Sequence, residues 1–414
     1  MSGNQSLKQI KVSLDFGSQS IFVGRLAIRD RVIYFQYDPE FLDRGFDISP
    51  LKLALSSELY SFQPRLFEGL PGVFNDSLPD GWGRLLVDRH LRSLGIIPEE
   101  FSALDRLAFV GQTGLGALTY LPDHTFEEKA DDIDLDLLAN DMREVLEGES
   151  TSVLERLIQL NGSSAGARPK ALVGVNADFS QIIHGNHIID PGFQHWLVKF
   201  ANSTDGNDAG AIEYVYSLMA NEAGVEMAAT HLFPALKGGG YFATRRFDRE
   251  ANERLHLHTA SGLLHSDFRV PSLDYEDLIA LTEYLTKDVR EVEKMFRLAV
   301  FNVLAHNRDD HGKNFSFLMD ATGTWRLSPA YDLTFSSGPR GHMSTMIMGE
   351  GMSPELSHIK SLGKIAGLDA RLVLEIIDQT QSALSRWSTL SRNYGVSKTN
   401  QRLIQSRLNL LGRS

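Results

Sequence analysis

Asp309 and Asn314 stand five positions apart in the segment 301–320, which reads FNVLAHNRDDHGKNFSFLMD. The segment begins as the apolar end of a helix, passes through a turn rich in charged residues and then becomes apolar again. In phosphoryl transfer, an aspartate receives the proton of the acceptor hydroxyl, and an asparagine five positions later binds Mg²⁺. An isolated D-x-x-x-x-N also fits an Asp- and Asn-rich surface turn. The choice between the two interpretations depends on the rest of the chain.

A loop of small residues, GSSAG at 162–166, follows a predicted helix and precedes Arg168, Lys170 and a predicted strand. Its backbone N–H groups could surround phosphate oxygens, and its small side chains would let the backbone approach them closely. The loop is neither a Walker A motif nor a G-x-G-x-x-G motif. A glycine turn that only ends the helix fits the same residues, so the loop by itself leaves both alternatives open.

Lys199 lies within the predicted apolar strand WLVKF, where its ammonium must be paired or reach solvent. Protein kinases place a lysine of this kind on the nucleotide phosphates, although an edge-strand lysine that extends to solvent is an alternative. Glu213 lies in the first turn of a predicted helix 14 residues later. Asp332 follows Asn314 by 18 residues, at the predicted end of a strand.

These parts occur in the order that protein kinases use, namely loop, strand lysine, helix glutamate, D-x-x-x-x-N and a later aspartate. The motif residues differ, since NRD stands where kinases have H-R-D, and YDL stands where they have D-F-G. Five unrelated structural features would have no reason to share this order. The order therefore favours a two-lobed phosphotransferase.

The elements that would position these residues can be predicted from residue periodicity. Alternation of apolar and polar residues at 8–36 predicts antiparallel strands joined by tight turns. Residues 76–79 predict a helix start, followed by the helix GWGRLLVDRHLRSLG that ends at Gly95. Residues 141–160 predict one helix, and residues 272–306 predict two helices. The second of these leads to the turn with Asp309 and Asn314, which we call the catalytic turn because of the chemistry expected there.

Composition sets limits on the kind of protein. A length of 414 residues favours two or three domains, and 42% hydrophobic with 23% charged residues is ordinary for a soluble protein. A net charge of -12 argues against binding nucleic acid through the overall field. The lack of cysteine excludes disulfides and thiolate metal sites. Because the sequence also lacks a secretory apolar stretch and a spanning-length apolar run, we expect a cytoplasmic protein.

Several motifs resemble the HipA family of bacterial type II toxin–antitoxin serine/threonine kinases. They are FNDSLPDGWGRLLVDR, GSSAGARPKAL, HWLVKF, RRFDR, NRDDHGKNFSFL and SPAYDLTFS. The resemblance extends over most of the chain, from about residue 10 to about residue 390. It implies an α+β, two-lobed kinase-like fold, with a β-rich N-terminal domain at 1–122, a small α/β N-lobe at 123–247 and an all-helical C-lobe at 248–414.

The resemblance also implies roles for single residues. Asp309 matches the general base, Asn314 and Asp332 match the Mg²⁺ ligands, and Lys199 matches the lysine on the ATP phosphates, with Glu213 as its partner. The other residues expected to contact ATP are Ser163, Ser164, Ala165, Gly166, Arg245, Phe247 and Lys313. Lys313 would offset charge on the transferred phosphoryl group. Asp310 and His311 would orient the turn, although a structural hydrogen bond is an equal alternative for His311.

Ser163, or else its neighbour Ser164, lies where the family autophosphorylates a loop serine. A phosphate there would place negative charge against the groups meant for ATP, expel the loop and switch the enzyme off. Arg168 stands where the family usually has glutamine, and Arg245 where it usually has glutamate, so the chain resembles a divergent subgroup.

We therefore expect an ATP- and Mg²⁺-dependent serine/threonine protein kinase that inhibits growth. The resemblance implies a translation protein such as an aminoacyl-tRNA synthetase as substrate and a HipB-like DNA-binding antitoxin as partner, with no strong direct binding of nucleic acid and no membrane. Two alternatives stay open. One is a degenerate kinase that acts as co-repressor or scaffold with the antitoxin, and the other is a small-molecule phosphotransferase that shares the D-x-x-x-x-N motif.

Overall fold

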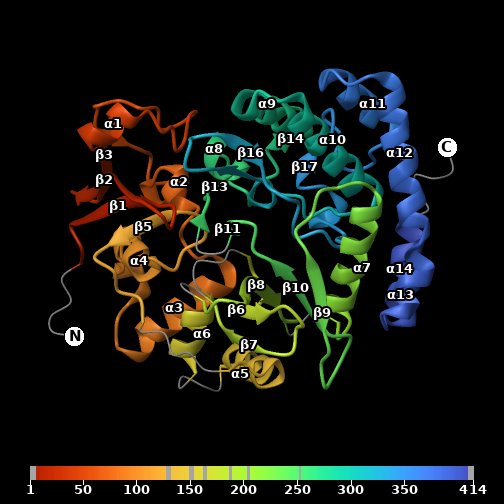
Figure 1. Cartoon of the computed structure of the whole chain (residues 1–414), viewed down its shortest axis with the longest axis horizontal. Coiled ribbons are helices and arrows are strands. Elements are labelled where there is room, and N and C mark those ends of the chain that lie inside the picture. The colour runs from red at the N-terminus through yellow and green to blue at the C-terminus, as the bar shows by residue number, and fades with distance from the viewer. Residues whose placement is uncertain are drawn as a thin grey trace.

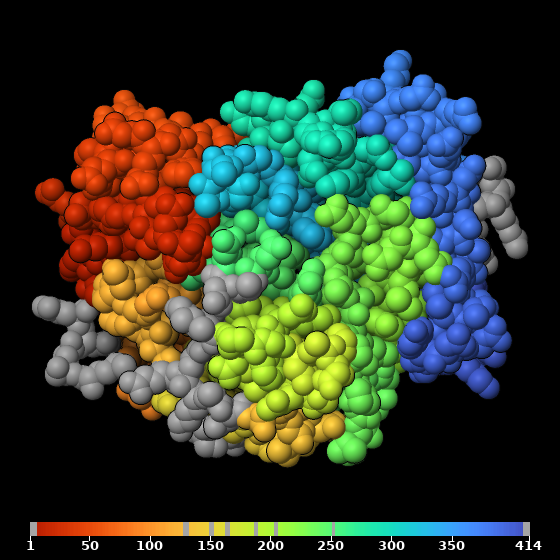
Figure 2. Space-filling model, in the orientation of Figure 1, coloured from red at the N-terminus to blue at the C-terminus, as the bar shows by residue number. Residues whose placement is uncertain are grey.

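Three groups of elements follow one another along the chain, as the colour gradient of Figure 1 shows. The structure is a computed structural model, and it describes residues 6–126, 132–148, 153–161, 166–185, 189–202, 206–250 and 253–408. Figure 2 shows the N-terminal residues, in red and orange, lying against the cyan residues of the C-terminal part.

The first group is a five-stranded antiparallel sheet in the order β4-β3-β2-β1-β5. Alternate residues of its first strand, such as Val12 and Leu14, are buried, as in a strand with one face on a core. This pairing confirms the strands predicted at 8–36. The strands are β1 (Gln9–Asp15), β2 (Ser20–Arg29), β3 (Val32–Tyr37), β4 (Tyr60–Ser61) and β5 (Leu118–Leu121). The helices are α1 (Pro39–Arg44), α2 (Gly72–Asn75), α3 (Gly81–Ser93) and α4 (Ala103–Val110).

The second group is another five-stranded antiparallel sheet, in the order β7-β6-β8-β10-β9. Its strands are β6 (Lys170–Asn176), β7 (Ile182–His184), β8 (Phe193–Lys199), β9 (Thr230–Phe233) and β10 (Tyr241–Arg245). Its helices are α5 (Leu135–Glu147), α6 (Leu154–Asn161) and α7 (Ala209–Glu222). We call this group the N-lobe.

The prediction of one helix over residues 141–160 is wrong. The chain forms α5 and α6 instead, because Gly148 adopts a left-handed backbone with φ of +84° and its N–H bonds back to the last turn of α5. A left-handed glycine after a helix is the commonest way in which helices end.

Helix α3 packs away from the sheet that precedes it in sequence. Its apolar side chains Trp82, Leu86, Val87 and Leu91 belong to the same buried cluster as residues of α6, β6 and β8. A second, larger cluster joins the N-terminal sheet to the C-terminal helices. The N-lobe core is therefore completed by a helix from the N-terminal part of the chain.

The third group, the C-lobe, is mainly helical, with long helices along one side of Figure 1. Its helices are α8 (Ala260–Leu264), α9 (Tyr275–Thr286), α10 (Val289–Leu304), α11 (Leu356–Ile365), α12 (Ala370–Ser385), α13 (Trp387–Asn393) and α14 (Lys398–Leu408). The two helices predicted over 272–306 are present as α9 and α10. Within the described ranges, no helix combines the length and the apolarity needed to cross a membrane.

The expectation of an all-helical C-lobe needs a correction, because short strands cross it. A three-stranded sheet pairs β13 (His256–Thr259), β15 (Ser316–Met319) and β16 (Trp325–Leu327), and β14 (Leu273–Asp274) pairs with β17 (Thr345–Met346). A small ribbon of β11 (Arg249–Glu250) and β12 (Glu253–Arg254) precedes them. Strand β15 begins two residues after Asn314, so this sheet fixes the end of the catalytic turn.

Candidate active site

Lys199, Glu213 and Asp332 meet in one group, which we call the lysine cluster. Lys199 is the last residue of β8, and its Nζ lies 2.5 Å from Glu213 Oε1, on α7, and 2.6 Å from Asp332 Oδ1. Glu213 is buried, whereas the Asp332 side chain is 36% exposed. The expected pairing of the strand lysine with the helix glutamate is therefore present, and Asp332 joins it from the C-lobe.

Burial and charge act against each other in this cluster. Burial would raise the pKa of Asp332, but the charges of Lys199 and Lys170 hold it well below its usual range. Burial would lower the pKa of Lys199, but Asp332 and Glu213 raise it above its usual value. Burial raises the pKa of Glu213, although Lys199 opposes this effect. Lys199 and Asp332 are thus an ionised pair at neutral pH.

Lys170 lies opposite Lys199 in the pairing of β6 with β8. Burial, together with the neighbouring Lys199 charge, lowers the pKa of Lys170 to about 8, although Asp332 and Asp80 oppose the shift. Arg168 adds a third cation, with its Nη1 3.9 Å from Glu213 Oε2. The site therefore concentrates positive charge next to Asp332.

The two adjacent acids of the catalytic turn have different environments. Asp310 is buried and accepts hydrogen bonds from Tyr275 Oη at 2.7 Å and from the N–H groups of Ser344 at 3.0 Å and Thr345 at 3.2 Å. Asp309 is exposed, and the side-chain amide of Asn314 donates to its backbone oxygen at 2.7 Å. Asp310 therefore anchors the turn, whereas Asp309 stays accessible.

The surroundings of Asp309 make its carboxylate a stronger base. Partial loss of hydration raises the pKa of Asp309, as does the charge of Asp332, whereas His311 and Arg168 lower it. His311 precedes the short helical turn Gly312–Asn314 and packs against the ring of Phe268 at 5.2 Å. A carboxylate with a raised pKa takes a proton from a hydroxyl more readily.

Asp332 does not end a strand, contrary to the prediction. Strand β16 ends at Leu327, and the chain then makes a short bridge between Ala330 and Met227 before it reaches Asp332. Asp332 has a left-handed backbone with φ of +58°. Aspartate tolerates this conformation better than most residues, and such backbone strain gathers at functional sites.

Of the remaining predicted residues, the structure describes Gly166, Arg245, Phe247 and Lys313. Ser163, Ser164 and Ala165 lie outside the described residues. Gly166 has φ of +102°. Arg245 is exposed at the end of β10, and Phe247 packs against the ring of Tyr331, the neighbour of Asp332, at 5.5 Å.

One further residue at the site was not singled out from the sequence. Asp80, at the start of α3, has its Oδ2 2.5 Å from Lys313 Nζ and accepts a hydrogen bond from Gly166 N–H. The sequence predicts a helix start at residues 76–79 and a family motif that includes Asp80, but no role for Asp80 itself. One sequence signal could have indicated a role for Asp80, since it lies between Pro79 and Gly81-Trp82 in a motif that carries the family resemblance.

The oxygen atoms present suit Mg²⁺ bound together with phosphates. Among the described residues, no group of three His, Cys, Asp or Glu is arranged to hold a metal ion without other ligands. Magnesium bound with nucleotides needs only one or two protein oxygens, because phosphates and water complete its shell. The Asp332 carboxylate has the oxygens that such a site needs. The amide nitrogen of Asn314 is used by Asp309 O, which leaves the amide oxygen for a cation.

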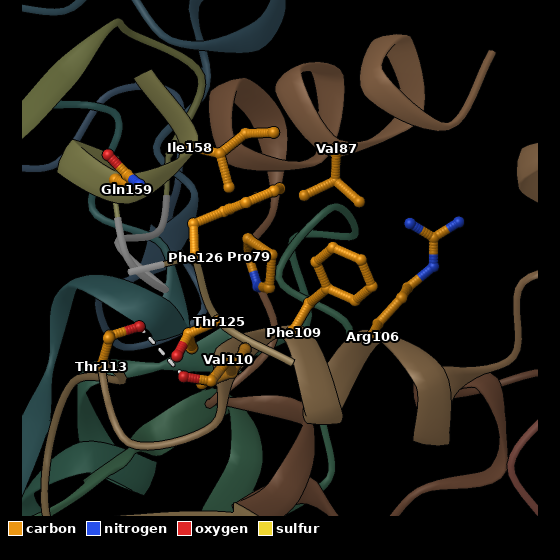
Figure 3. A pocket seen from close by; sticks show the side chains of 10 residues that line it. All are labelled: Pro79, Val87, Arg106, Phe109, Val110, Thr113, Thr125, Phe126, Ile158 and Gln159. Atoms are coloured by element: carbon orange, nitrogen blue, oxygen red, sulfur yellow. Dashed lines mark hydrogen bonds between the residues drawn. The ribbon is translucent and has the colours of Figure 1, made fainter. Parts of the chain in front are cut away.

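One open pocket is lined by residues outside the lysine cluster, and another lies at the lysine cluster. The first, of about 510 Å³, lies between α3, α4 and α6, and Figure 3 shows Val87, Phe109, Phe126 and Ile158 around it. None of its ten described lining residues is among the predicted site residues. The second, of about 500 Å³, is lined by Lys199, Glu213 and Arg168 together with the start of α7. The lysine cluster therefore opens on the second pocket.

Known proteins resemble this chain in sequence and in fold. Residues 14–121 match the family described as HipA N-terminal domain, and residues 162–387 match the family described as HipA-like C-terminal domain. A protein of Sinorhizobium fredii (strain NBRC 101917 / NGR234) named "Putative kinase Y4mE" is 26% identical over 384 residues, which are 86% of each chain. A chain of the Shewanella oneidensis MR-1 toxin–antitoxin complex of HipA, HipB and operator DNA covers 97% of both chains, with 16% identity and a TM-score of 0.68. This likeness confirms the expected kinase-like α+β fold.

Proposed function

The chain belongs to the HipA family, and from this premise we propose that it is an ATP- and Mg²⁺-dependent serine/threonine protein kinase. The observation that supports the proposal most strongly is the meeting of Lys199, Glu213 and Asp332, drawn from β8, α7 and the C-lobe. Protein kinases require both the lysine–glutamate pair and the metal-binding aspartate.

Each residue has a distinct role in this proposal. Lys199 neutralises the nucleotide phosphates, and Glu213 holds it in place. Asp332 and Asn314 bind Mg²⁺, which neutralises charge on the phosphates when bound. Asp309 orients the acceptor hydroxyl and receives its proton while the new oxygen–phosphorus bond forms and the bond to the leaving ADP breaks. Lys313 offsets negative charge on the transferred group.

We also propose that the kinase is the toxin of a toxin–antitoxin pair and that its partner is a HipB-like DNA-binding antitoxin. The family match supports this role, and the Shewanella complex contains HipA with HipB and operator DNA. The net charge of -12 fits a chain that leaves the contact with DNA to its partner. The proposed substrate is a translation protein such as an aminoacyl-tRNA synthetase, and phosphorylation of Ser163 or Ser164 would regulate the kinase.

The direct test is phosphate transfer from labelled ATP in the presence of Mg²⁺ by the full chain and by Asp309→Asn. We expect the variant to lose activity by about 100- to 10,000-fold, because it can no longer accept the hydroxyl proton. Asp378→Asn, an exposed substitution on α12, is the matched control and should keep full activity. Equal or absent transfer in all three proteins would contradict the proposal and favour a scaffold that acts with the antitoxin.

Substrate identity calls for a second measurement. Phosphorylated proteins in cells that express the full chain would be compared with those in cells that express Asp309→Asn. A translation protein phosphorylated only by the former would support the proposed toxin role. Transfer to a small molecule with no protein target would contradict it.

A further inference from the structure

Asp80 begins α3, but its side chain does not cap that helix. An aspartate at this position usually accepts a hydrogen bond from an N–H in the first helical turn. Asp80 has the extended backbone of such a residue, with φ of -120° and ψ of 179°, yet its carboxylate accepts no hydrogen bond from α3. Both carboxylate oxygens are instead directed to other parts of the chain.

One oxygen of Asp80 contacts the glycine-rich loop and the other contacts the catalytic turn. Oδ1 accepts from the N–H of Gly166, and Oδ2 lies 2.5 Å from Lys313 Nζ. The Asp80 and Lys313 side chains are only 16% and 7% exposed. A residue of the N-terminal part of the chain therefore joins two segments that the kinase chemistry needs.

The backbone beside Asp80 reinforces this contact. The N–H of Trp82 donates to Gly166 O at 3.0 Å, and the Trp82 side chain is buried in the N-lobe core. Gly81 has φ of +45°, and a Cβ there would lie 2.5 Å from Gly166 O. Only glycine can occupy this position without displacing the loop. The close approach is therefore built into the sequence Asp80-Gly81-Trp82.

Electrostatics favours an ionised carboxylate at this contact. Burial would raise the pKa of Asp80, but the charge and hydrogen bond of Lys313, the N–H of Gly166 and the charge of Lys170 hold it below its usual value. Lys313 is held from its other sides as well. Its Nζ lies 4.8 Å from the centre of the Phe268 ring, and its backbone oxygen accepts from Tyr331 Oη at 2.6 Å.

Asp76, at the other end of the same short segment, fixes it to the C-lobe. Its Oδ2 lies 2.6 Å from His258 Nδ1 and accepts from the N–H of Thr259 at 2.8 Å, and its Oδ1 accepts from Thr259 Oγ1 at 2.9 Å. The Asp76 and His258 side chains are almost fully buried. The segment that carries Asp80 is thus anchored on both lobes.

We propose that Asp80 is a positioning residue of the phosphotransfer site. Its Oδ2 holds the Lys313 ammonium where it can meet phosphate, and its Oδ1 holds the end of the glycine-rich loop. The N-terminal part of the chain thereby completes the kinase site. This inference rests on the proposed kinase function.

The two oxygens allow a test that separates these tasks, using Asp80→Asn and Asp80→Ala in the full chain. Asparagine keeps an oxygen for Gly166 but loses the charge that holds Lys313, whereas alanine loses both. For Asp80→Asn we expect kcat to fall about 10- to 100-fold, with the KM for ATP changed less than about threefold. For Asp80→Ala we expect the same fall in kcat and, in addition, a rise in KM of about fivefold or more.

A measurement without ATP tests the loop contact independently of catalysis. Amide hydrogen exchange of the peptide that contains Gly166 should be faster in Asp80→Ala and unchanged in Asp80→Asn, because only alanine removes the acceptor. Asp80→Glu should restore kcat to within about threefold, since it keeps the carboxylate. The control is Glu68→Gln, which breaks a surface ion pair of 2.7 Å with Arg84, a residue of α3. This variant should match the unchanged chain in every readout.

Failure of this inference can be told apart from failure of the kinase proposal. Absent phosphate transfer by the unchanged chain contradicts the kinase proposal. Unchanged kcat in Asp80→Asn, or unchanged exchange at Gly166 in Asp80→Ala, overturns the role of Asp80. A fall in activity that only parallels a fall in Tm, with KM and kcat affected alike in both variants, also overturns it, because it indicates a purely structural residue.

Discussion

This protein has two clusters of charged side chains with little exposure, and the charges of the two clusters are paired in different ways. The lysine cluster consists of Lys199, which pairs with both Glu213 and Asp332, and its Lys199 and Glu213 line a pocket of about 500 Å³. The second group, which we call the arginine cluster, lies where the N-lobe meets the C-lobe. It consists of Arg246, Asp248, Arg249 and Arg254.

Within the arginine cluster, the charged groups hydrogen-bond to one another and to the backbone. Arg246 makes two hydrogen bonds to Asp248, at 3.0 and 2.7 Å, and Arg249 Nη1 makes another at 2.8 Å. Asp248 also accepts from the N–H of Gly116, and Arg254 donates to Gly116 O at 2.9 Å. These bonds hold the loop before β5 against the start of the C-lobe.

The difference shows that buried charge is a poor marker of function by itself. Both groups shift pKa values strongly, because burial and opposite charges act in both. Backbone carbonyls accept from the guanidinium groups of Arg249 and Arg254, and the Asp248 carboxylate accepts from that of Arg246, so this cluster is structural. In the lysine cluster, carboxylate side chains pair with Lys199, and Lys199 itself lines a pocket.

Among the substitutions that test this difference, Asp248→Asn should have the largest effect on stability. The substitution leaves the buried guanidinium groups of Arg246 and Arg249 without their carboxylate, which costs about 3–5 kcal/mol of unfolding free energy. Urea unfolding of the variant measures this loss against Asp378→Asn as control. A loss below about 1 kcal/mol would show that the cluster does not depend on the Asp248 charge.

Asp332→Asn should behave in the opposite way. We expect phosphate transfer to fall about 100- to 1,000-fold, because the variant loses a charged metal ligand. Unfolding free energy should change by less than about 1 kcal/mol, since Lys199 keeps Glu213 and Asp332 is partly exposed. Activity assays and urea unfolding on the same preparation check both parts. A destabilisation as large as that of Asp248→Asn would remove the distinction between the clusters.

Asp310 should have a smaller effect on stability, and this effect should depend on pH. Neutral donors rather than cations bind its buried carboxylate, so no nearby positive charge offsets the cost of ionising it. Burial raises the pKa of Asp310 from 3.8 to about 7. The folded state therefore binds this proton more tightly than the unfolded state. The resulting stabilisation is complete below about pH 4 and is lost as the pH rises through about 7.

Asp310→Asn should remove this dependence. Between pH 5 and 7, the unfolding free energy of the unchanged chain should fall more steeply than that of the variant, by up to about 1.4 kcal/mol per pH unit. Thermal and urea unfolding at several pH values provide the measurement. Parallel slopes in the two proteins would mean that Asp310 is ionised in the folded state throughout this range.

Local sequence signals were enough to predict most of the elements and the meeting of Lys199 with Glu213. Periodicity predicted α9 and α10, and the order of motifs placed the lysine, the glutamate and Asp332 in one site. The break between α5 and α6 was missed because the apolar residues before and after Gly148 stay in helical phase, although residues 147–152 contain none.

Contacts between distant segments could not be predicted from the same signals. Asp80 and Lys313 are 233 positions apart, and no periodicity links them. The turn that contains Asp332 depends on a bridge from Ala330 to Met227, which is likewise a tertiary contact. Propensity describes a residue with its neighbours in sequence, whereas these positions are determined by packing between segments.

The packing of α3 has a consequence for how such chains can be recombined in evolution. Trp82, Leu86, Val87 and Leu91 complete the core beneath β6 and β8, so a crossover near residue 122 would join a foreign helix to a native sheet. The hybrid would inherit cavities or clashes unless matching substitutions arose on both sides. We therefore expect the sequences of the N-terminal part and the N-lobe to be inherited as one unit.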